Sequence, residues 1–466
     1  MKKIAEGLPG HKAIGLDDIP NEFYKRAPNF IINFLVVYFN SVLNHSHVCQ
    51  DISNVLLVPI IKDRLKNPSD SSNYRPIAIA TASSKILEKI ILSRLGEYLE
   101  TSDSQWGFKK EHSTEMCVYA LKEVINYYRK LSSPVFVCFL DLKSAFDRVS
   151  YRRLFRKLLY RRVPLYLVRI LRNWYESQIL YVAWGSSRSS PFTMGNGIRQ
   201  GSLISPYLFN VYVDELNIRL NAAGTGCQLA GTTANNFAYA DDFALLAPTA
   251  RALNDLLKIC EVFAVENYIV FNTLKSVCML VPALRAVKFV APNIYLCGTI
   301  LKYVESFRYL GHIITQEQSD EQDMLRELRS LYYRGNMLIR KFSFCTEDVK
   351  CGLFRTFCYS LYGSSLWSQF RTSVFRKLKV CYNTIFRKLA GIPPWVSPRS
   401  LFVQLGVLSF GEILRKKMFS LMSRLRVNSN CVIKAIINSD ASALSCIFEY
   451  YRKFLYVNPT CYVFLN

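Results

Sequence analysis

The sequence predicts an α+β protein with strands in its middle part and a helical C-terminal third. Residues 135–140 form a continuous apolar run, which is typical of a strand covered on both faces of a sheet. Residues 236–246 have the pattern of two strands around a turn that holds two adjacent acids. Beyond residue 316 long helical patterns dominate. One apolar stripe there consists of Leu325, Leu328, Tyr332, Gly335 and Ile339.

The N-terminal part of the chain mixes helical patterns with one short extended run at residues 55–61. Residues 66–73 are polar and contain proline, serine and aspartate, which indicates an exposed loop. A helix is expected over roughly residues 83–99.

The charge of the chain favours a polyanionic partner. Among its 466 residues, 59 Lys and Arg against 35 Asp and Glu give a net charge of +24. This suggests nucleic acid or an acidic membrane surface, although on charge alone a basic enzyme with another substrate stays open. Hydrophobic residues make up 50% of the chain and aromatic residues 14%, which excludes a disordered chain. Residues 321–466 hold 22 Lys and Arg against 8 Asp and Glu, so the excess is concentrated in the helical part.

No membrane-spanning segment is predicted. The most apolar early run, residues 30–39, is shorter than the roughly 20 residues that span a bilayer. A secretory signal pattern is also missing from the start of the sequence, so the fourteen cysteines favour a reducing compartment. None of them forms the C-x-x-C pair typical of zinc sites, and Cys351 and Cys358 are expected in the core.

The first candidates for chemistry are the acids Asp141, Asp241 and Asp242. Each lies at the end of an apolar strand or in the turn after it, where a carboxylate gains nothing from packing. Converging carboxylates repel one another unless a cation holds them, and hard oxygen ligands suit Mg²⁺. Two such ions about 3.5–4 Å apart would support phosphoryl transfer. For the adjacent acid pair alone, a solvated turn is the alternative.

Three segments follow one another along the chain in this order: FLDLKSAFDRV at 139–149, GIRQGSLISP at 197–206 and FAYADD at 237–242. They resemble motifs A, B and C of the palm of reverse transcriptases, specifically those of non-LTR (LINE-type) retrotransposons. Further segments resemble the fingers motifs, motif D and the primer grip of that family. These are residues 58–62 with 73–78, 105–110 with 112–114, 271–276 and 309–311, so the resemblance covers roughly residues 10–430.

The resemblance implies a right-hand polymerase with helical fingers, an antiparallel-sheet palm and an α-helical thumb. Residues 1–40 would form the N-terminal part of the fingers, and residues 41–315 the reverse transcriptase domain of fingers and palm. Residues 316–466 would form the helical thumb and C-terminal region, whose basic faces would follow phosphates without reading base sequence.

The resemblance also implies an RNA-directed DNA polymerase that extends a primer 3′-hydroxyl by two-metal nucleotidyl transfer. Asp141, Asp241 and Asp242 would hold two Mg²⁺ ions, with Mn²⁺ as the alternative metal. The backbone carbonyl of Leu142 would add a ligand. Lys275 would protonate the pyrophosphate leaving group, unless it is a plain surface lysine. The partners would be an RNA template, a DNA primer and deoxynucleoside triphosphates, with no membrane.

Five residues match positions that contact the nucleotide in this family. Lys62 and Arg75 would hold the triphosphate, for which a lysine charge and an arginine fork are suited. Phe146 would act as a steric gate against a 2′-hydroxyl. Gln200 and Gly201 would lie by the templating base, where glycine permits close backbone approach. The alternatives are an exposed loop for the two cations, a core position for the phenylalanine and a simple turn for the glycine.

The resemblance further implies that Tyr309, Leu310 and Gly311 form a hairpin that touches the primer; an ordinary hairpin is the alternative. Asp18 stands where the family has a glycine, so a left-handed backbone conformation there would be strained.

Two rival functions stay open at this stage. One is a truncated, non-enzymatic relic that folds and binds RNA, because no endonuclease signature or zinc knuckle is present and the chain is expected to lack its own endonuclease. The other is an RNA-dependent RNA polymerase, which would need a polar residue in place of Phe146. An intracellular, nuclear location is implied by the family alone.

Overall fold

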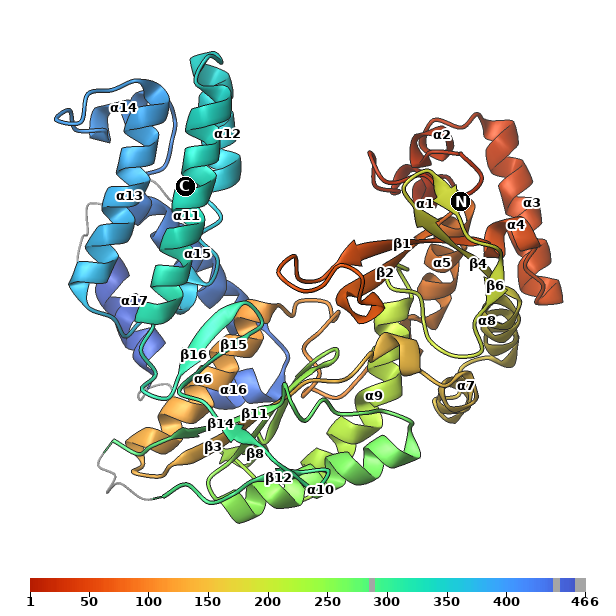
Figure 1. Cartoon of the computed structure of the whole chain (residues 1–466), viewed down its shortest axis with the longest axis horizontal. Coiled ribbons are helices and arrows are strands. Elements are labelled where there is room, and N and C mark those ends of the chain that lie inside the picture. The colour runs from red at the N-terminus through yellow and green to blue at the C-terminus, as the bar shows by residue number, and fades with distance from the viewer. Residues whose placement is uncertain (285–289, 439–444, 457–466) are drawn as a thin grey trace. The chain divides into compact units, whose positions relative to one another are not determined.

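The computed structural model describes residues 1–284, 290–438 and 445–456, and the chain divides into two compact units (Figure 1). Unit 1 comprises residues 1–108, 142–219 and 259–272. Unit 2 comprises residues 109–141, 220–258 and 273–466. The division predicted at residues 40 and 315 separates functional parts and stays a prediction.

Unit 1 combines a set of helices with one five-stranded sheet of order β2-β1-β4-β5, in which β6 also pairs with β4. Its helices are α1 (Lys2–Glu6), α2 (Asn21–Lys25), α3 (Asn29–His45), α4 (Gln50–Ser53), α5 (Ala82–Leu95), α7 (Tyr151–Tyr160) and α8 (Leu165–Ser177), with the 3-10 turns η1 (Ser71–Asn73), η2 (Gly96–Leu99) and η3 (Phe146–Arg148). Its strands are β1 (Val55–Ile61), β2 (Tyr74–Ala80), β4 (Ile179–Trp184), β5 (Ser187–Arg188) and β6 (Phe192–Thr193).

The local predictions for this part of the chain are confirmed. The extended run at residues 55–61 is β1, and the expected helix is α5 continued by η2. Asp18 has φ +52°, in the left-handed region, as its replacement of a glycine suggested. The sheet itself was not expected beside the helices, because β1 pairs in parallel with β4, a strand far along the chain.

Unit 2 is built around a second five-stranded sheet, of order β14-β11-β3-β10-β9. Its strands are β3 (Val135–Leu140), β9 (Asn236–Tyr239), β10 (Asp242–Ala247), β11 (Val277–Val281) and β14 (Lys302–Tyr303). All neighbours are antiparallel except β11 and β14, which are parallel. Every residue of β3 is buried, as its continuous apolar run predicted, and α6 (Thr114–Lys130) packs against this strand.

The remaining elements before the C-terminal helices are two long helices and three short hairpins. The helices α9 (Ser205–Ala222) and α10 (Ala250–Glu266) contribute residues to both units. The hairpins are β7 (Gln228–Leu229) with β8 (Thr232–Thr233), β12 (Tyr295–Leu296) with β13 (Thr299–Ile300), and β15 (Ser306–Tyr309) with β16 (His312–Thr315).

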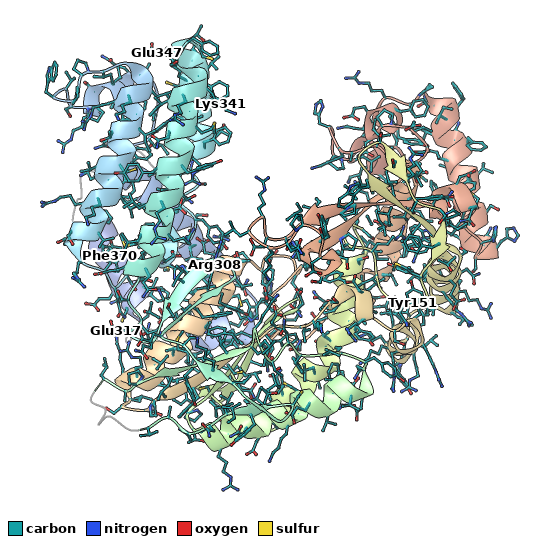
Figure 2. The ribbon with its side chains drawn as sticks, in the orientation of Figure 1. Tyr151, Arg308, Glu317, Lys341, Glu347 and Phe370 are labelled. Atoms are coloured by element: carbon teal, nitrogen blue, oxygen red, sulfur yellow. The ribbon has the colours of Figure 1, made fainter. Side chains whose placement is uncertain are left out.

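The last part of unit 2 is helical, as predicted. It contains α11 (Glu321–Phe342), α12 (Glu347–Cys358), η4 (Ser364–Leu366), α13 (Thr372–Ala390), α14 (Arg399–Gln404), α15 (Phe410–Val427), α16 (Cys431–Asn438) and α17 (Cys446–Tyr456). Lys341 and Glu347 mark the two sides of the turn between α11 and α12, and Phe370 lies just before α13 (Figure 2).

The apolar face of α11 differs from the predicted stripe. Its buried apolar residues are Met324, Leu331, Gly335 and Leu338, whereas Tyr332 is 48% exposed. Leu325, Leu328 and Ile339 of the predicted stripe are partly buried and pack against the core of these helices, so the prediction is wrong for Tyr332 alone. The packing of α12 and α13 against α11 decides which face is covered. Cys351 and Cys358 are buried in the same core, as expected.

A buried charged cluster ties the start of α11 to its neighbours. The carboxylate of Asp320 lies 2.5 Å from the Nζ atom of Lys122 in α6 and accepts a hydrogen bond from the backbone N–H of Ser368. One turn on, Asp323 accepts hydrogen bonds from Nε1 of Trp367 at 2.8 Å and from the backbone N–H of Ile313 in β16 at 3.1 Å. Buried charges are tolerated here because each is paired.

No helix in the described part of the chain is both long and apolar enough to cross a membrane. This agrees with the short apolar runs in the sequence.

The packing of α11 against α13 is testable at Gly335. A Cβ atom built there would lie 2.4 Å from Cδ1 of Ile385. Gly335→Ala should therefore lower the free energy of unfolding by about 1–3 kcal/mol, because overpacking displaces the neighbouring side chain. Gly352→Ala in α12 is the matched control, since a Cβ atom there meets nothing within 4 Å, and it should stabilise by about 0.5–1 kcal/mol. Urea unfolding followed by circular dichroism measures both, and equal effects would contradict the close packing.

Candidate active site

The sheet of unit 2 brings two of the three predicted acids together through its register. Asp141 directly follows β3, and Asp242 is the first residue of β10. These strands are antiparallel, and Phe243 pairs with Leu140. One step further along this register, Asp242 lies opposite Asp141, so the two carboxylates start from adjacent backbone positions.

Asp241 lies in the turn beside them. Tyr239 pairs with Asp242, which leaves Ala240 and Asp241 as a two-residue hairpin loop between β9 and β10. Ala240 has φ +56°, which a residue with a Cβ atom adopts only at a cost. The tight turn therefore holds strained backbone at the point where the acids meet.

The electrostatics of the site show that the carboxylate of Asp242 senses the charges of the other two acids. The pKa of Asp242 is raised to about 6, first by partial removal of the carboxylate from water and then by the charges of Asp241 and Asp141. Repulsion between like charges disfavours the ionised form, and a divalent cation would relieve it.

The donor set fits Mg²⁺ without forming a closed cage. Within the described residues, no group of three or more His, Cys, Asp or Glu side chains is already arranged to hold a metal ion. Mg²⁺ keeps several waters and is usually bound by one or two carboxylates together with substrate phosphates. An open cluster of carboxylates at a strand end matches that behaviour.

A cavity of about 300 Å³ in unit 2 collects several of the predicted site residues. It is lined by Phe139, Leu140, Asp141, Asp242, Phe243, Lys275, Phe307 and Tyr309. Lys275 is exposed, so its ammonium group can reach a ligand in this cavity. Two of the three acids, Asp141 and Asp242, therefore share one cavity with the lysine of motif D and the tyrosine of the predicted primer grip.

Two supporting residues hold the strand ends in place. The backbone N–H of Asp141 donates to Oγ of Ser276 at 3.1 Å. The hydroxyl of Tyr309 donates to the backbone carbonyl of Phe237 at 3.0 Å, and its ring is only 2% exposed. Sequence reasoning placed Tyr309 against a primer and did not single out Ser276. Their contacts are to distant segments and leave no local signal.

The hairpin tip that follows Tyr309 is formed by Leu310 and Gly311, because Tyr309 pairs with His312. Both tip residues have positive φ, at +47° and +83°. The hydroxyl of Tyr362 donates to the carbonyl of Leu310 at 2.7 Å, and a Cβ atom at Gly311 would lie 2.9 Å from the same ring. A glycine is therefore required there, and the primer-gripping role of the tip stays a prediction.

The other predicted residues lie in unit 1. Leu142 is buried and forms an isolated bridge with Phe271. Phe146 is partly exposed and stacks on Phe209, with ring centroids 4.8 Å apart and planes 9° apart. This stacking supports one face of the ring, and the role of Phe146 as a steric gate stays a prediction.

Lys62 and Arg75 lie at the end of the β1–β2 hairpin where the loop connects the two strands, and both are exposed. The Nζ atom of Lys62 donates to the carbonyl of Ser72 at 2.9 Å. The backbone carbonyl of Asn73 accepts from the N–H of Lys62 at 2.8 Å, which closes the polar loop. Two cations at the end of a rigid hairpin are suited to phosphate oxygens.

Gly201 is more than a turn glycine. It has φ +111°, and a Cβ atom there would lie 2.9 Å from the carbonyl oxygen of Ala78 in β2. The preceding carbonyl, of Gln200, accepts from the N–H of Ala78 at 2.6 Å. The amide of Gln200 donates to Asp147 at 3.2 Å. The loop of motif B is thus fixed to β2 by backbone contact.

A buried ion pair that sequence reasoning missed supports the same loop. Glu88 in α5 accepts hydrogen bonds from Oγ of Ser202 and from the N–H of Leu203, both at 2.6 Å. Arg199 lies 3.7 Å from Glu88, and its guanidinium group lies 4.5 Å from the ring centroid of Trp174. A carboxylate on the apolar face of a helix was the one signal that could have revealed Glu88.

Comparison with known proteins decides the family. Residues 64–314 match the family described as reverse transcriptase (RNA-dependent DNA polymerase), which is more than half of the chain. The chain belongs to the reverse transcriptase family. The predicted resemblance to the enzymes of non-LTR retrotransposons is confirmed.

The relatives of this reverse transcriptase come from mobile elements. It is 23% identical over 450 residues to the RNA-directed DNA polymerase from mobile element jockey of Drosophila funebris, covering 94% of this chain and 48% of that protein. It is 25% identical over 455 residues to a probable RNA-directed DNA polymerase from transposon BS of Drosophila melanogaster, covering 93% and 49%. The chain thus spans about half the length of these curated relatives.

Among solved structures, the apo telomerase of Candida tropicalis matches with 12% identity and a TM-score of 0.46. The match covers 93% of this chain and 72% of that one.

The partial burial of Asp242, together with the charges of Asp241 and Asp141 beside it, predicts that Asp242→Asn stabilises the fold at neutral pH. The folded-state pKa of about 6 exceeds the ordinary value of 3.8. The ionised carboxylate therefore destabilises the fold fully above pH 6, and this penalty disappears as the pH falls towards 3.8. Allowing for solvent around a partly exposed group, the variant should gain about 1–2 kcal/mol at pH 7 and little at pH 4.

Thermal unfolding at the two pH values measures this gain. Asp255→Asn is the matched control, because Asp255 is an exposed acid on α10 that, among the described residues, forms an ion pair only with Lys258, at 4.0 Å. If Asp242→Asn is no more stable than this control at pH 7, the proposed crowding of the acids is wrong.

Proposed function

We propose that this chain catalyses RNA-templated DNA synthesis, extending the 3′-hydroxyl of a DNA primer with deoxynucleoside triphosphates. The observation that carries the proposal is the strand register that sets Asp141 opposite Asp242 in the wall of a cavity. Membership of the reverse transcriptase family supports it.

The chemistry is attack of the primer O3′ atom on the α-phosphate, with pyrophosphate as the leaving group. Asp141, Asp241 and Asp242, with the carbonyl of Leu142, would hold two Mg²⁺ ions. When bound, these ions activate the attacking oxygen and neutralise the charge on the phosphate oxygens. Lys275, in the wall of the same cavity as Asp141 and Asp242, would donate a proton to the departing pyrophosphate.

Residues of unit 1 would select and hold the nucleotide. Lys62 and Arg75 would bind the triphosphate, and the ring of Phe146 would leave no room for a 2′-hydroxyl. Gln200 and Gly201 would border the templating base. The stacking of Phe146 on Phe209 and the close backbone contact of Gly201 with Ala78 support these roles, because a discriminating site must not yield to the wrong substrate.

The primer strand would contact the hairpin tip of Leu310 and Gly311. The adjacent Tyr309 fixes this tip to the sheet through its hydrogen bond to the carbonyl of Phe237. The RNA template would lie along basic helix faces of the C-terminal region, held through its phosphates. Action on chromosomal DNA in the nucleus is expected for an element of this family.

Primer extension tests the proposed activity. With Mg²⁺, a poly(rA) template and an oligo(dT) primer, the unmodified chain should incorporate dTTP. Asp241→Asn should reduce the rate by roughly 10³-fold or more, since charge stabilisation by metal is worth several kcal/mol. Asp255→Asn should leave the rate unchanged. Failure of the unmodified chain to extend any primer while still binding RNA would favour the relic.

Phe146 predicts the sugar preference. Phe146→Ala should raise the use of UTP relative to dTTP by about tenfold or more, because the clash with the 2′-hydroxyl is removed. Phe192→Ala, at an exposed phenylalanine in β6, is the matched control. A preference for UTP in the unmodified chain would instead favour an RNA-dependent RNA polymerase.

A further inference from the structure

The helix α7 and the turn after it form a cationic segment that the proposed polymerase mechanism does not use. Residues 151–162 contain six Lys or Arg and no Asp or Glu. Like charges on one helix repel one another, so anionic partners stabilise this segment, whether they are carboxylates of the chain or a ligand.

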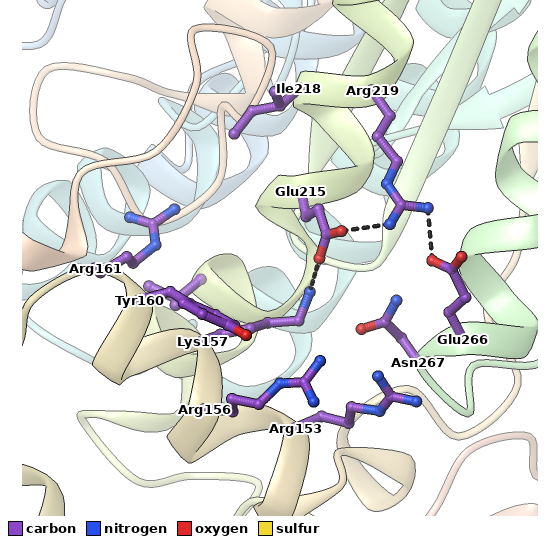
Figure 3. Close-up of a pocket in the computed structure, with 11 residues that line it drawn as sticks. Arg153, Arg156, Lys157, Tyr160, Arg161, Glu215, Ile218, Arg219, Glu266 and Asn267 are labelled. Carbon is purple, nitrogen blue, oxygen red and sulfur yellow. Dashed lines mark hydrogen bonds and ion pairs between the residues drawn. The ribbon is translucent and has the colours of Figure 1, made fainter.

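One face of this segment borders a cavity of about 530 Å³ in unit 1 (Figure 3). The other walls are formed by α9 and by the end of α10. Five of the lining side chains are cationic and two are carboxylates, Glu215 and Glu266. The cavity therefore has an excess of positive charge. None of its lining residues belongs to the cavity beside the acids of unit 2.

Both carboxylates of the cavity already form ion pairs within the chain. Glu215 pairs with Lys157 and with Arg219, each at 2.5 Å. Glu266 pairs with Arg219 at 2.6 Å. Arg161 is held as well, by Asp214 at 2.5 Å. These ion pairs account for three of the five cations.

Arg153 and Arg156 are the remaining two. Neither forms an ion pair with a carboxylate in the part of the chain that the structure describes, and they lie side by side at the cavity wall (Figure 3). Each guanidinium group instead lies 5.6 Å from the ring centroid of a tyrosine, Tyr268 for Arg153 and Tyr160 for Arg156. These rings are 60% and 73% exposed.

We propose that Arg153, Arg156, Tyr160 and Tyr268 form a binding site for single-stranded nucleic acid. The two guanidinium groups would hold phosphates of the strand, to which arginine presents a planar fork of donors. The exposed tyrosine rings would stack on unpaired bases, which binds any sequence because every base has a π-face.

The aromatic rings favour a strand over a small anion. Free phosphate or pyrophosphate would use the arginines alone and leave two large exposed rings without a role. A duplex would keep its bases stacked on one another and could not use the rings. The residues of this site have no role in the proposed nucleotide addition, and a strand can bind there without DNA synthesis.

The test is a binding titration on the full chain without Mg²⁺. The chain is first saturated with unlabelled primer–template duplex, and a fluorescent 12-nucleotide oligouridylate is then added over a series of salt concentrations. Arg153→Gln with Arg156→Gln should weaken binding about tenfold. It should also reduce the slope of log K against log salt by about 1.4, or about 0.7 for each lost phosphate contact on a single strand.

The matched control is Arg152→Gln with Arg169→Gln, which removes the same charge from exposed positions of α7 and α8 outside the cavity. It should change affinity by less than about twofold. Tyr160→Ala with Tyr268→Ala should weaken binding about tenfold without changing the salt slope. Oligothymidylate should bind as well as oligouridylate, because neither contact reads a 2′-hydroxyl.

Two results would overturn the proposal. One is equal binding by the arginine variant and its control, with matching thermal unfolding to show that both are folded. The other is unchanged binding by the tyrosine variant together with displacement of the strand by inorganic pyrophosphate, which would indicate an anion site only. Because the assay does not require extension of a primer, it can succeed or fail separately from the polymerase activity.

Discussion

The antiparallel pairing of β3 with β10 is the constraint on which the candidate active site depends. It sets Asp141 opposite Asp242, whose pKa is raised first by partial removal of the carboxylate from water and then by the charges of Asp241 and Asp141. A sheet can hold such a pair only at a strand end, where water or a cation reaches the carboxylates, and only if the rest of the sheet offsets the repulsion. All of β3 and all of β10 after Asp242 are buried, which provides the apolar burial that stabilises this arrangement.

Uncharged contacts then hold the strand ends against that repulsion. Oγ of Ser276 accepts a hydrogen bond from the backbone N–H of Asp141, and the buried hydroxyl of Tyr309 donates a hydrogen bond to the carbonyl of Phe237 in β9. Ala240 stays in a left-handed conformation because both flanking strands are fixed in the sheet. Strain and like-charge repulsion therefore coincide in one turn, and the same field that destabilises the carboxylates attracts a divalent cation.

In unit 1 the decisive contacts are between backbone segments. The loop of motif B lies so close to β2 that only glycine fits at position 201, and Glu88 fixes the next two residues of the loop. Buried charge is tolerated there because Glu88 and Arg199 are near each other and carry further contacts. On α7 the opposite holds: Arg153 and Arg156 have aromatic neighbours and form no ion pair with a carboxylate of the described residues. This difference distinguishes a structural charge from one available to a ligand.

The sequence by itself determined the family, the α+β class and the strands that carry the acids. Patterns of adjacent residues encode strands, and motif order along the chain is unaffected by packing. Only the tertiary structure decided which face of α11 is buried, that Tyr309 faces the core and that Glu88 holds the motif B loop. It also decided that Arg153 and Arg156 remain unpaired among the described residues while Arg161 does not. Burial and ion pairing depend on segments far apart in sequence, so the net charge of +24 could indicate a polyanion without indicating where it binds.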